Sequence, residues 1–422
     1  MRTPPPDPPR PRGARRRAAG ASLVLLGAVL LVVGGLAGCR ASGRSSPPAA
    51  ASPRDVAKTL GRVLDARARA VRRDEPAAFD RLLGGAPAFR HQQATWFADL
   101  VLLPVQRLSY RFDPETIVRR GSAYWVTVEE SLQLGGYDAA PVVRADRWRF
   151  GPAHRDGGRF VLTSVTDPTW EAAHPVELQP WDLGPVQVRE DGPVLGIFDA
   201  GSVADAPGVL DSVSRGVAAV AAEVPYGWSR SVVVYALSRP TFLDRLDDVP
   251  GDDPEDLDAV AFPVGRSTRF VLNPRMLGRA GPGRDRLVRH ELTHVALGTR
   301  DDDVPVWLSE GLAEWVSVGP MAPQDRRIPE AAVRAAETGA PELPNDADFN
   351  GADAQAHYGL AWWAVEYLAD TYGDEEPWRL LDAMDRPGAD PDRVLLDRYG
   401  LTPHTLAHHA ERSILAVYEG VS

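Results

Sequence analysis

The sequence predicts an α+β protein in two modules, the second of which has a mostly helical C-terminal half. Apolar residues recur at helical spacing over residues 55–83, near the start of the first module. Four strand-like runs separated by turn residues follow between residues 106 and 165. From about residue 193 strands and helices alternate, and beyond residue 326 only helical patterns remain. Helices followed by a strand meander indicate helices packed on one face of an antiparallel sheet.

The first residues differ in composition from the rest of the chain. An arginine-rich start precedes an apolar run over residues 21–37, and Gly38 and Cys39, the only cysteine, follow. A basic start with an apolar core is typical of an export signal, and the ending resembles a bacterial lipobox. We therefore expect residues 1–38 to be a lipoprotein signal peptide, Cys39 to carry the lipid, and residues 39–53, rich in Ser, Pro and Ala, to be a flexible spacer. The alternative is an uncleaved membrane anchor. Both place the body outside the cytoplasm and tether it to the membrane.

Residues 54–185 form the first predicted module, an α+β unit. Its helices are expected at 55–83 and 89–103, and its strands at 106–112, 123–132, 142–150 and 159–165. Gly135-Gly136 and Asp156-Gly157-Gly158 are typical of the turns between strands. This layout is similar to the SnoaL-like fold. The histidines of the module are isolated and show no metal-ligand spacing.

Residues 190–420 form the second predicted module. Strands are expected at 193–198, 231–236, 259–264 and 268–272, and the last two could pair. Helices are expected at 204–224, 240–246, 326–337, 358–372, 378–384, 390–398 and 403–418. An acidic loop is expected at 247–258.

The stretch HELTH, residues 290–294, indicates a metal site. His290 and His294 are four residues apart, so a helix places both rings on one face. Two imidazoles can then reach one zinc ion, each about 2 Å from it. Glu291 points about 100° away, where it could take a proton from a metal-activated water. Apolar neighbours supply a buried flank, and Gly298 can end the helix.

A second helix is expected to complete the site. A catalytic zinc site needs a third protein ligand, and Glu310 in the segment WLSEGLAEW can supply it. Glu314 lies one turn further on the same face, where it could accept the remaining N–H of a ligating histidine. The connection 299–305 is short enough to set the two helices side by side.

These two segments resemble those of the gluzincin metallopeptidases, and most closely the bacterial Peptidase MA-like proteins. The resemblance covers roughly residues 190–415. It implies zinc as the cofactor, His290, His294 and Glu310 as ligands, Glu291 as general base and Glu314 as the acidic residue that orients a ligand. Fifteen residues separate His294 from Glu310, fewer than in the best-known members. This departure leaves Glu314 as a rival third ligand.

The resemblance also implies residues that contact substrate. A Tyr or His from a later helix stabilises the oxyanion in such enzymes, which makes Tyr358 the first candidate and His357 the second. An edge strand commonly holds extended substrate, and Phe270, Val271 and Leu272 stand where it is expected. A further pair, His404 and His408, has helical spacing but no acidic helix beside it, so we expect an exposed helix there.

The expected function is that of a lipid-anchored, extracytoplasmic zinc metallopeptidase acting on peptides or proteins. The alternative is a non-catalytic surface lipoprotein with a structural metal site and a partner-binding α+β module. The formal net charge is -11, and the arginines lie scattered among acidic residues. This distribution argues against nucleic acid as a partner.

Overall fold

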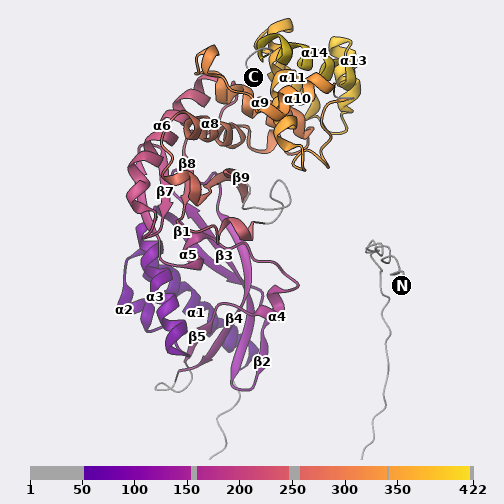
Figure 1. Cartoon of the computed structure of the whole chain (residues 1–422). Helices are drawn as coiled ribbons and strands as arrows, with labels where there is room; N and C mark the ends of the chain where they lie inside the picture. The colour runs from indigo at the N-terminus through magenta and orange to yellow at the C-terminus, as the bar shows by residue number, and fades with distance from the viewer. Residues whose placement is uncertain (1–51, 154–158, 247–256, 340–341, 419–422) are drawn as a thin grey trace, which may run out of the picture. The chain divides into compact units, whose positions relative to one another are not determined.

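A computed structural model describes residues 52–153, 159–246, 257–339 and 342–418, which belong to one compact unit. These residues form an α+β protein, as the sequence predicts (Figure 1). The predicted signal peptide, Cys39, residues 40–51 of the spacer, the turn 156–158 and most of the loop 247–258 lie outside the described residues. None of the described helices is both long enough and apolar enough to span a bilayer.

The first module begins with three helices. The side chain of Ser52 caps the first by accepting a hydrogen bond from the Asp55 N–H at 3.2 Å. The helical pattern over 55–83 is broken where Asp74 adopts a φ of 50° and Pro76 starts a new helix. The elements are α1 (Pro53–Arg72), α2 (Pro76–Asp80), α3 (Pro87–Leu102), β1 (Val105–Phe112), β2 (Val118–Arg120), β3 (Ala123–Leu134), β4 (Val142–Pro152), β5 (Phe160–Ser164), α4 (Pro168–Glu171) and α5 (Pro180–Leu183).

The strands of this module form an antiparallel sheet in the order β1-β3-β4-β5, with β2 paired to β3. Residues of α1 and α3 pack with the sheet in a common apolar core that includes Leu60, Trp96, Leu108 and Val126, all buried. Helices on an antiparallel sheet are the arrangement that the strand meander predicts.

The second sheet is mixed and has the order β6-β7-β8-β10-β9. β7, β8 and β10 are parallel, whereas β6 and β9 run antiparallel at the two edges. The expectation that residues 270–272 form an edge strand is wrong, because β10 is bonded on one side to β8 and on the other to β9. The strands are β6 (Gln187–Asp191), β7 (Val194–Phe198), β8 (Val232–Ala236), β9 (Ala259–Val264) and β10 (Ser267–Leu272).

Both faces of the second sheet are covered. Successive side chains of a strand point to opposite faces, so Val232 and Val234 join the core that includes α6 (Ala206–Glu223) and α8 (Pro282–Leu297). Val233 and Tyr235 join the core of the first module. Buried Arg269 of β10 also pairs with Asp138 of the first module at 2.6 Å. The division near residue 185 stays a prediction, but the two modules share this core.

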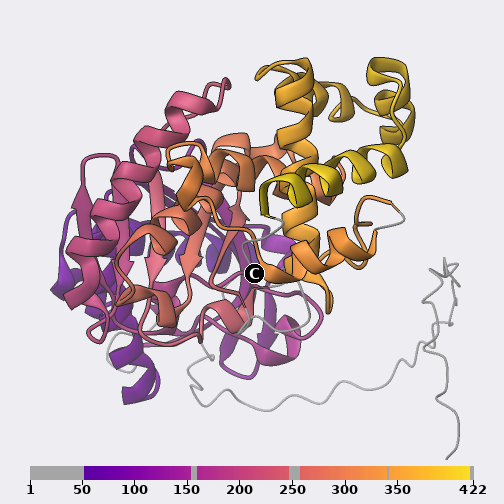
Figure 2. The ribbon, with the colours of Figure 1, turned by 45° about the horizontal axis from the view of Figure 1, so that its top comes forward.

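The C-terminal half is helical, and its helices group together (Figure 2). Gly311 lets two of them approach closely, since a Cβ there would lie 2.6 Å from the carbonyl oxygen of Ala361. The expected helix at 240–246 is only a short 3-10 turn, Leu243–Arg245. The remaining helices are α7 (Pro274–Leu277), α9 (Val306–Val318), α10 (Glu330–Thr338), α11 (Ala354–Tyr372), α12 (Glu376–Met384), α13 (Pro391–Tyr399) and α14 (Pro403–Tyr418).

Candidate metal centre

Helix α8 carries the two histidines on one face and buries its opposite face. Pro282 begins the helix, and Gly298, with a φ of 61°, follows its last residue. Val288 and Leu292 are fully buried and pack against Gly216 of α6, where a Cβ would lie 2.7 Å from a Leu292 methyl. This close packing fixes the helix that presents the motif.

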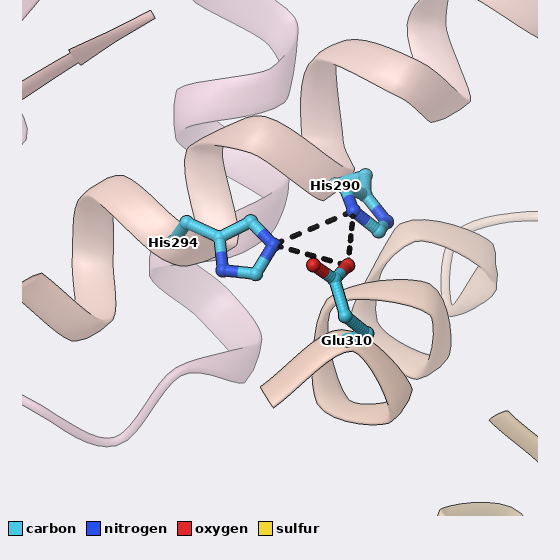
Figure 3. A group of neighbouring side chains, drawn as sticks. All are labelled: His290, His294 and Glu310. Carbon is cyan, nitrogen blue, oxygen red and sulfur yellow. Dashed lines mark hydrogen bonds and ion pairs between the residues drawn. The ribbon is translucent and has the colours of Figure 1, made fainter. Parts of the chain in front are cut away.

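His290, His294 and Glu310 converge, and their ligand atoms form a small triangle (Figure 3). Glu310 Oε2 lies 3.1 Å from His290 Nε2 and 3.5 Å from His294 Nε2, and the two Nε2 atoms are 3.4 Å apart. Tetrahedral ligands about 2.0–2.1 Å from a metal are separated by about 3.3–3.4 Å. The three side chains are therefore a possible metal-binding site with the spacing that a tetrahedral ion requires.

Each histidine has a carboxylate at its other ring nitrogen. His290 Nδ1 lies 3.0 Å from Glu314 Oε1, and His294 Nδ1 lies 2.9 Å from Asp301 Oδ2. When a cation replaces the proton on Nε2, a carboxylate beside Nδ1 favours the tautomer that keeps the remaining ring proton on Nδ1. Glu310 Oε2 is buried and has no hydrogen-bond donor among the described residues. Three possible ligand atoms thus face one point, an arrangement that a cation would satisfy.

The pKa values of the histidines and of Glu310 also indicate that these side chains favour a positive charge between them. Burial alone would lower the pKa of His290, but Glu310 and Glu314 raise it to about 10. The pKa of His294 is likewise raised well above its usual value, because Glu310 and Asp301 outweigh burial. The histidines in turn lower the pKa of Glu310 against the effect of burial. A bound cation would replace these protons, so metal binding and proton release are coupled here.

Glu291 lies beside the triangle without belonging to it. Its side chain is buried at 5 % exposure, and burial raises its pKa, although His290 and His294 partly offset this rise. It lines both hollows that flank the triangle, which have volumes of about 970 Å³ and 370 Å³. A carboxylate in this position can exchange protons with a molecule in the cleft.

Of the two oxyanion candidates, only Tyr358 lies at the centre. Its ring is 6.0 Å from that of His290, and its hydroxyl donates to Asn350 Oδ1 at 3.1 Å. Burial and then Glu310, Glu291 and Glu314 raise its pKa well above the usual value, so the hydroxyl stays protonated. His357 instead has its Nδ1 2.8 Å from the Phe349 carbonyl oxygen and lines neither hollow.

Strand β9 borders the site in place of the expected residues 270–272. Residues 259–263 of this edge strand line the smaller hollow together with Glu291 and Tyr358. Phe270, Val271 and Leu272 are buried in β10, whose backbone is paired with neighbours on both sides. β9 is an edge strand of the sheet, and its residues 259–263 are therefore the strand segment that borders the smaller hollow.

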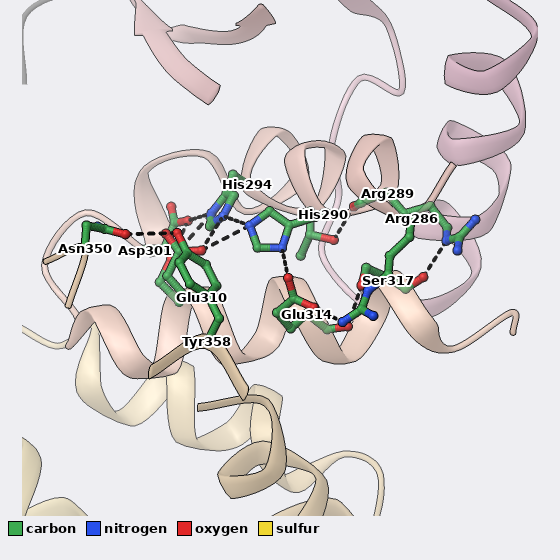
Figure 4. A network of polar contacts seen from close by, with 12 residues as sticks. Arg286, Arg289, His290, His294, Asp301, Glu310, Glu314, Ser317, Asn350 and Tyr358 are labelled. Atoms are coloured by element: carbon green, nitrogen blue, oxygen red, sulfur yellow. Dashed lines mark hydrogen bonds and ion pairs between the residues drawn. The ribbon is translucent and has the colours of Figure 1, made fainter. Parts of the chain in front are cut away.

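Three residues of the site were missed by sequence reasoning (Figure 4). Asp301, which contacts His294, lies in the connection that was considered only for its length. Its place seven residues after His294 is a signal that could have found it. Arg286, one turn before His290, pairs with Glu314. Asn350 lies in an irregular segment with no periodic pattern, so the sequence holds no signal for its contact with Tyr358.

Comparisons with known proteins give no family for this chain. No protein-family model matches it, and a search of curated proteins found no match either.

Proposed function

We propose that this chain is a zinc metallopeptidase of the gluzincin type that hydrolyses peptide bonds. One observation carries the proposal: two imidazole nitrogens and one carboxylate oxygen converge at 3.1–3.5 Å beside a buried carboxylate, Glu291, which lines an open cleft. Two imidazoles and one carboxylate are a donor set that suits zinc. A site with only three protein ligands leaves a coordination position for chemistry.

Each residue of the site has a role in the proposed reaction. Zinc held by His290, His294 and Glu310 would supply a Lewis acid and lower the pKa of a coordinated water. Glu291 takes the proton of the attacking water and passes it to the departing amine nitrogen. Tyr358 donates a hydrogen bond to the oxyanion, with His357 as a more distant second candidate.

The substrate in this proposal is an extended peptide. The free edge of β9 offers backbone donors and acceptors that pair with a peptide strand. Glu314 and Asp301 orient the two histidines. The proposed location is extracytoplasmic and lipid-anchored, and it depends on the sequence around Cys39 alone.

The test combines metal content with peptide cleavage. The purified chain is expected to contain one zinc per molecule and to cleave a peptide mixture in a way that a chelator abolishes and added zinc restores. Glu291→Gln should keep the metal and lose activity by about 100-fold or more. Glu330→Gln, at an exposed position of α10, is the matched control and should be fully active.

A different outcome would support the alternative function. Stoichiometric zinc without cleavage of any peptide by the wild-type chain would indicate a structural metal site in a non-catalytic surface lipoprotein. Activity that survives in Glu291→Gln would remove this residue from the mechanism.

A further inference from the structure

The first module contains a cavity of its own. It lies between α1, α3, β3, β4 and the segment 165–185, and its volume is about 380 Å³, within the range of small-molecule sites. Trp96, Trp148 and Trp181 contribute to its wall. None of its lining residues lines the hollows around the metal centre.

A buried arginine in the wall has no negatively charged partner among the described residues. Arg67 is 2 % exposed, and its guanidinium donates to the Tyr110 hydroxyl at 3.2 Å and to Gln93 Oε1 at 2.6 Å. Its guanidinium carbon lies 4.3 Å from the ring centroid of Trp96 and 4.5 Å from that of Phe79. These partners are all neutral, and the buried NH1 group has no acceptor in the described chain. Burial of an unpaired charge is costly unless an anion approaches it.

Two of the three carboxylates in the cavity wall form ion pairs with another arginine. Glu130 and Asp182 both bind Arg144, at 2.8 Å and 3.0 Å from its NH2 group. Asp146 is the third carboxyl, and burial raises its pKa to about 7, so it can be neutral when an anion is close. Glu130 and Asp182 share the single positive charge of Arg144, and among the described residues no carboxylate is hydrogen-bonded to Arg67.

We propose that this cavity binds a small organic acid, with its carboxylate on Arg67 and its apolar body against the three tryptophans. Guanidinium and carboxylate form strong, charge-assisted hydrogen bonds. The aromatic wall favours a flat apolar group over a sugar or a free inorganic anion. This binding activity is distinct from peptide hydrolysis and does not depend on it.

Binding of phenylacetate to the full chain in detergent micelles tests the proposal, with phenylacetamide as a neutral probe of the same shape. Titration calorimetry is expected to show phenylacetate binding at least tenfold more tightly than phenylacetamide, because only the acid pairs with Arg67. Arg67→Met should abolish this preference. Arg90→Gln is the matched control, because Arg90 is exposed and pairs with Asp80, and it should keep the preference.

A second variant covers the case in which Arg67→Met does not fold. Val176→Trp adds bulk to a partly exposed wall position without changing Arg67, and it should weaken phenylacetate binding at least tenfold. Equal affinity of the wild-type chain for the two probes would overturn the proposal. Phenylacetate binding that persists unchanged in the variants would also overturn it, since that binding would be elsewhere, for example on the metal.

Discussion

Two pairs of histidines in this chain have the same spacing and opposite surroundings. His290 and His294 on α8 face buried Glu310, and each has a second carboxylate at its other ring nitrogen. His404 and His408 on α14 are exposed, and His408 Nδ1 lies 3.5 Å from a carboxylate oxygen of Glu411 on the same helix. Among the described residues, only the first pair belongs to a set of three converging metal donors.

The comparison indicates that helical spacing places two histidine rings side by side but is not sufficient to make a cation-binding site. Selection comes from a second helix that buries acidic groups against the rings and leaves them no proton donor. When an exposed pair of histidines binds a cation, its side chains lose conformational entropy. The gain in binding free energy is small, because water competes for the cation.

The largest expected effect is loss of the metal from the buried pair. His290→Ala or His294→Ala removes a ligand and should leave less than a tenth of the wild-type zinc after dialysis, measured by elemental mass spectrometry. The double variant His404→Ala/His408→Ala should keep the full zinc content. Equal zinc loss in both cases would show that the metal does not distinguish the two pairs.

A smaller effect is expected from the carboxylates that orient the rings. Asp301→Asn and Glu314→Gln should each weaken zinc binding by about 10–100-fold in a chelator competition, because the ring proton is held less firmly on Nδ1. Asp302→Asn changes an exposed neighbour of Asp301 and is the matched control. Unchanged affinity in Asp301→Asn would mean that His294 is oriented by packing alone.

The next effect tests the helix packing that brings the acidic groups to the buried pair. Gly311→Ala places a Cβ 2.6 Å from the Ala361 carbonyl oxygen and should push α9 from α11, which carries Tyr358. We expect the free energy of unfolding to fall by about 1–3 kcal/mol in urea denaturation. Gly319→Ala, whose Cβ would meet only ordinary contacts beginning at 3.4 Å, should differ little from wild type.

The smallest effect concerns pH and His409, a neighbour of the exposed pair. His409, beside His408, stacks on Tyr367 with 4.3 Å between ring centroids. Burial, then Arg412 and His408, lower its pKa below 6.5. The unfolded chain therefore binds more protons in this window, so the contribution of His409 to stability is full above pH 6.5 and falls as the pH drops toward the lowered pKa.

Proton NMR titration should place His409 below the usual value for histidine. His409→Gln should remove this pH-dependent contribution, which we expect to be less than about 1 kcal/mol because the ring is partly exposed. A titration midpoint above 6.5 would contradict the assigned surroundings of α14.

The possible metal-binding site could largely be predicted from the sequence, because its signals are local. Helical spacing alone places His290, His294, Glu310 and Glu314 on two faces that must meet across a short connection. The choice between Tyr358 and His357 was not predictable, since it depends on packing against an irregular segment around Asn350.

The position of the edge strand could not be predicted from the sequence either. Residues 259–264 and 267–272 form two short adjacent strands with similar apolar patterns, and their pairing was expected. Which of them also pairs with β8 depends on contacts with residues far along the chain. The break between α1 and α2 was visible in principle, because Pro76 interrupts the helical pattern there.

The shared core of the second sheet has a consequence for how this architecture could arise. A sheet with α8 on one side and the first module on the other has no face left for water, so loss of residues 54–185 would expose Leu195, Ile197 and Val233 together. Such a shortened chain would have to acquire another cover for these side chains or associate with itself. Gene rearrangements that separate the two halves should therefore be rare among functional descendants of this protein.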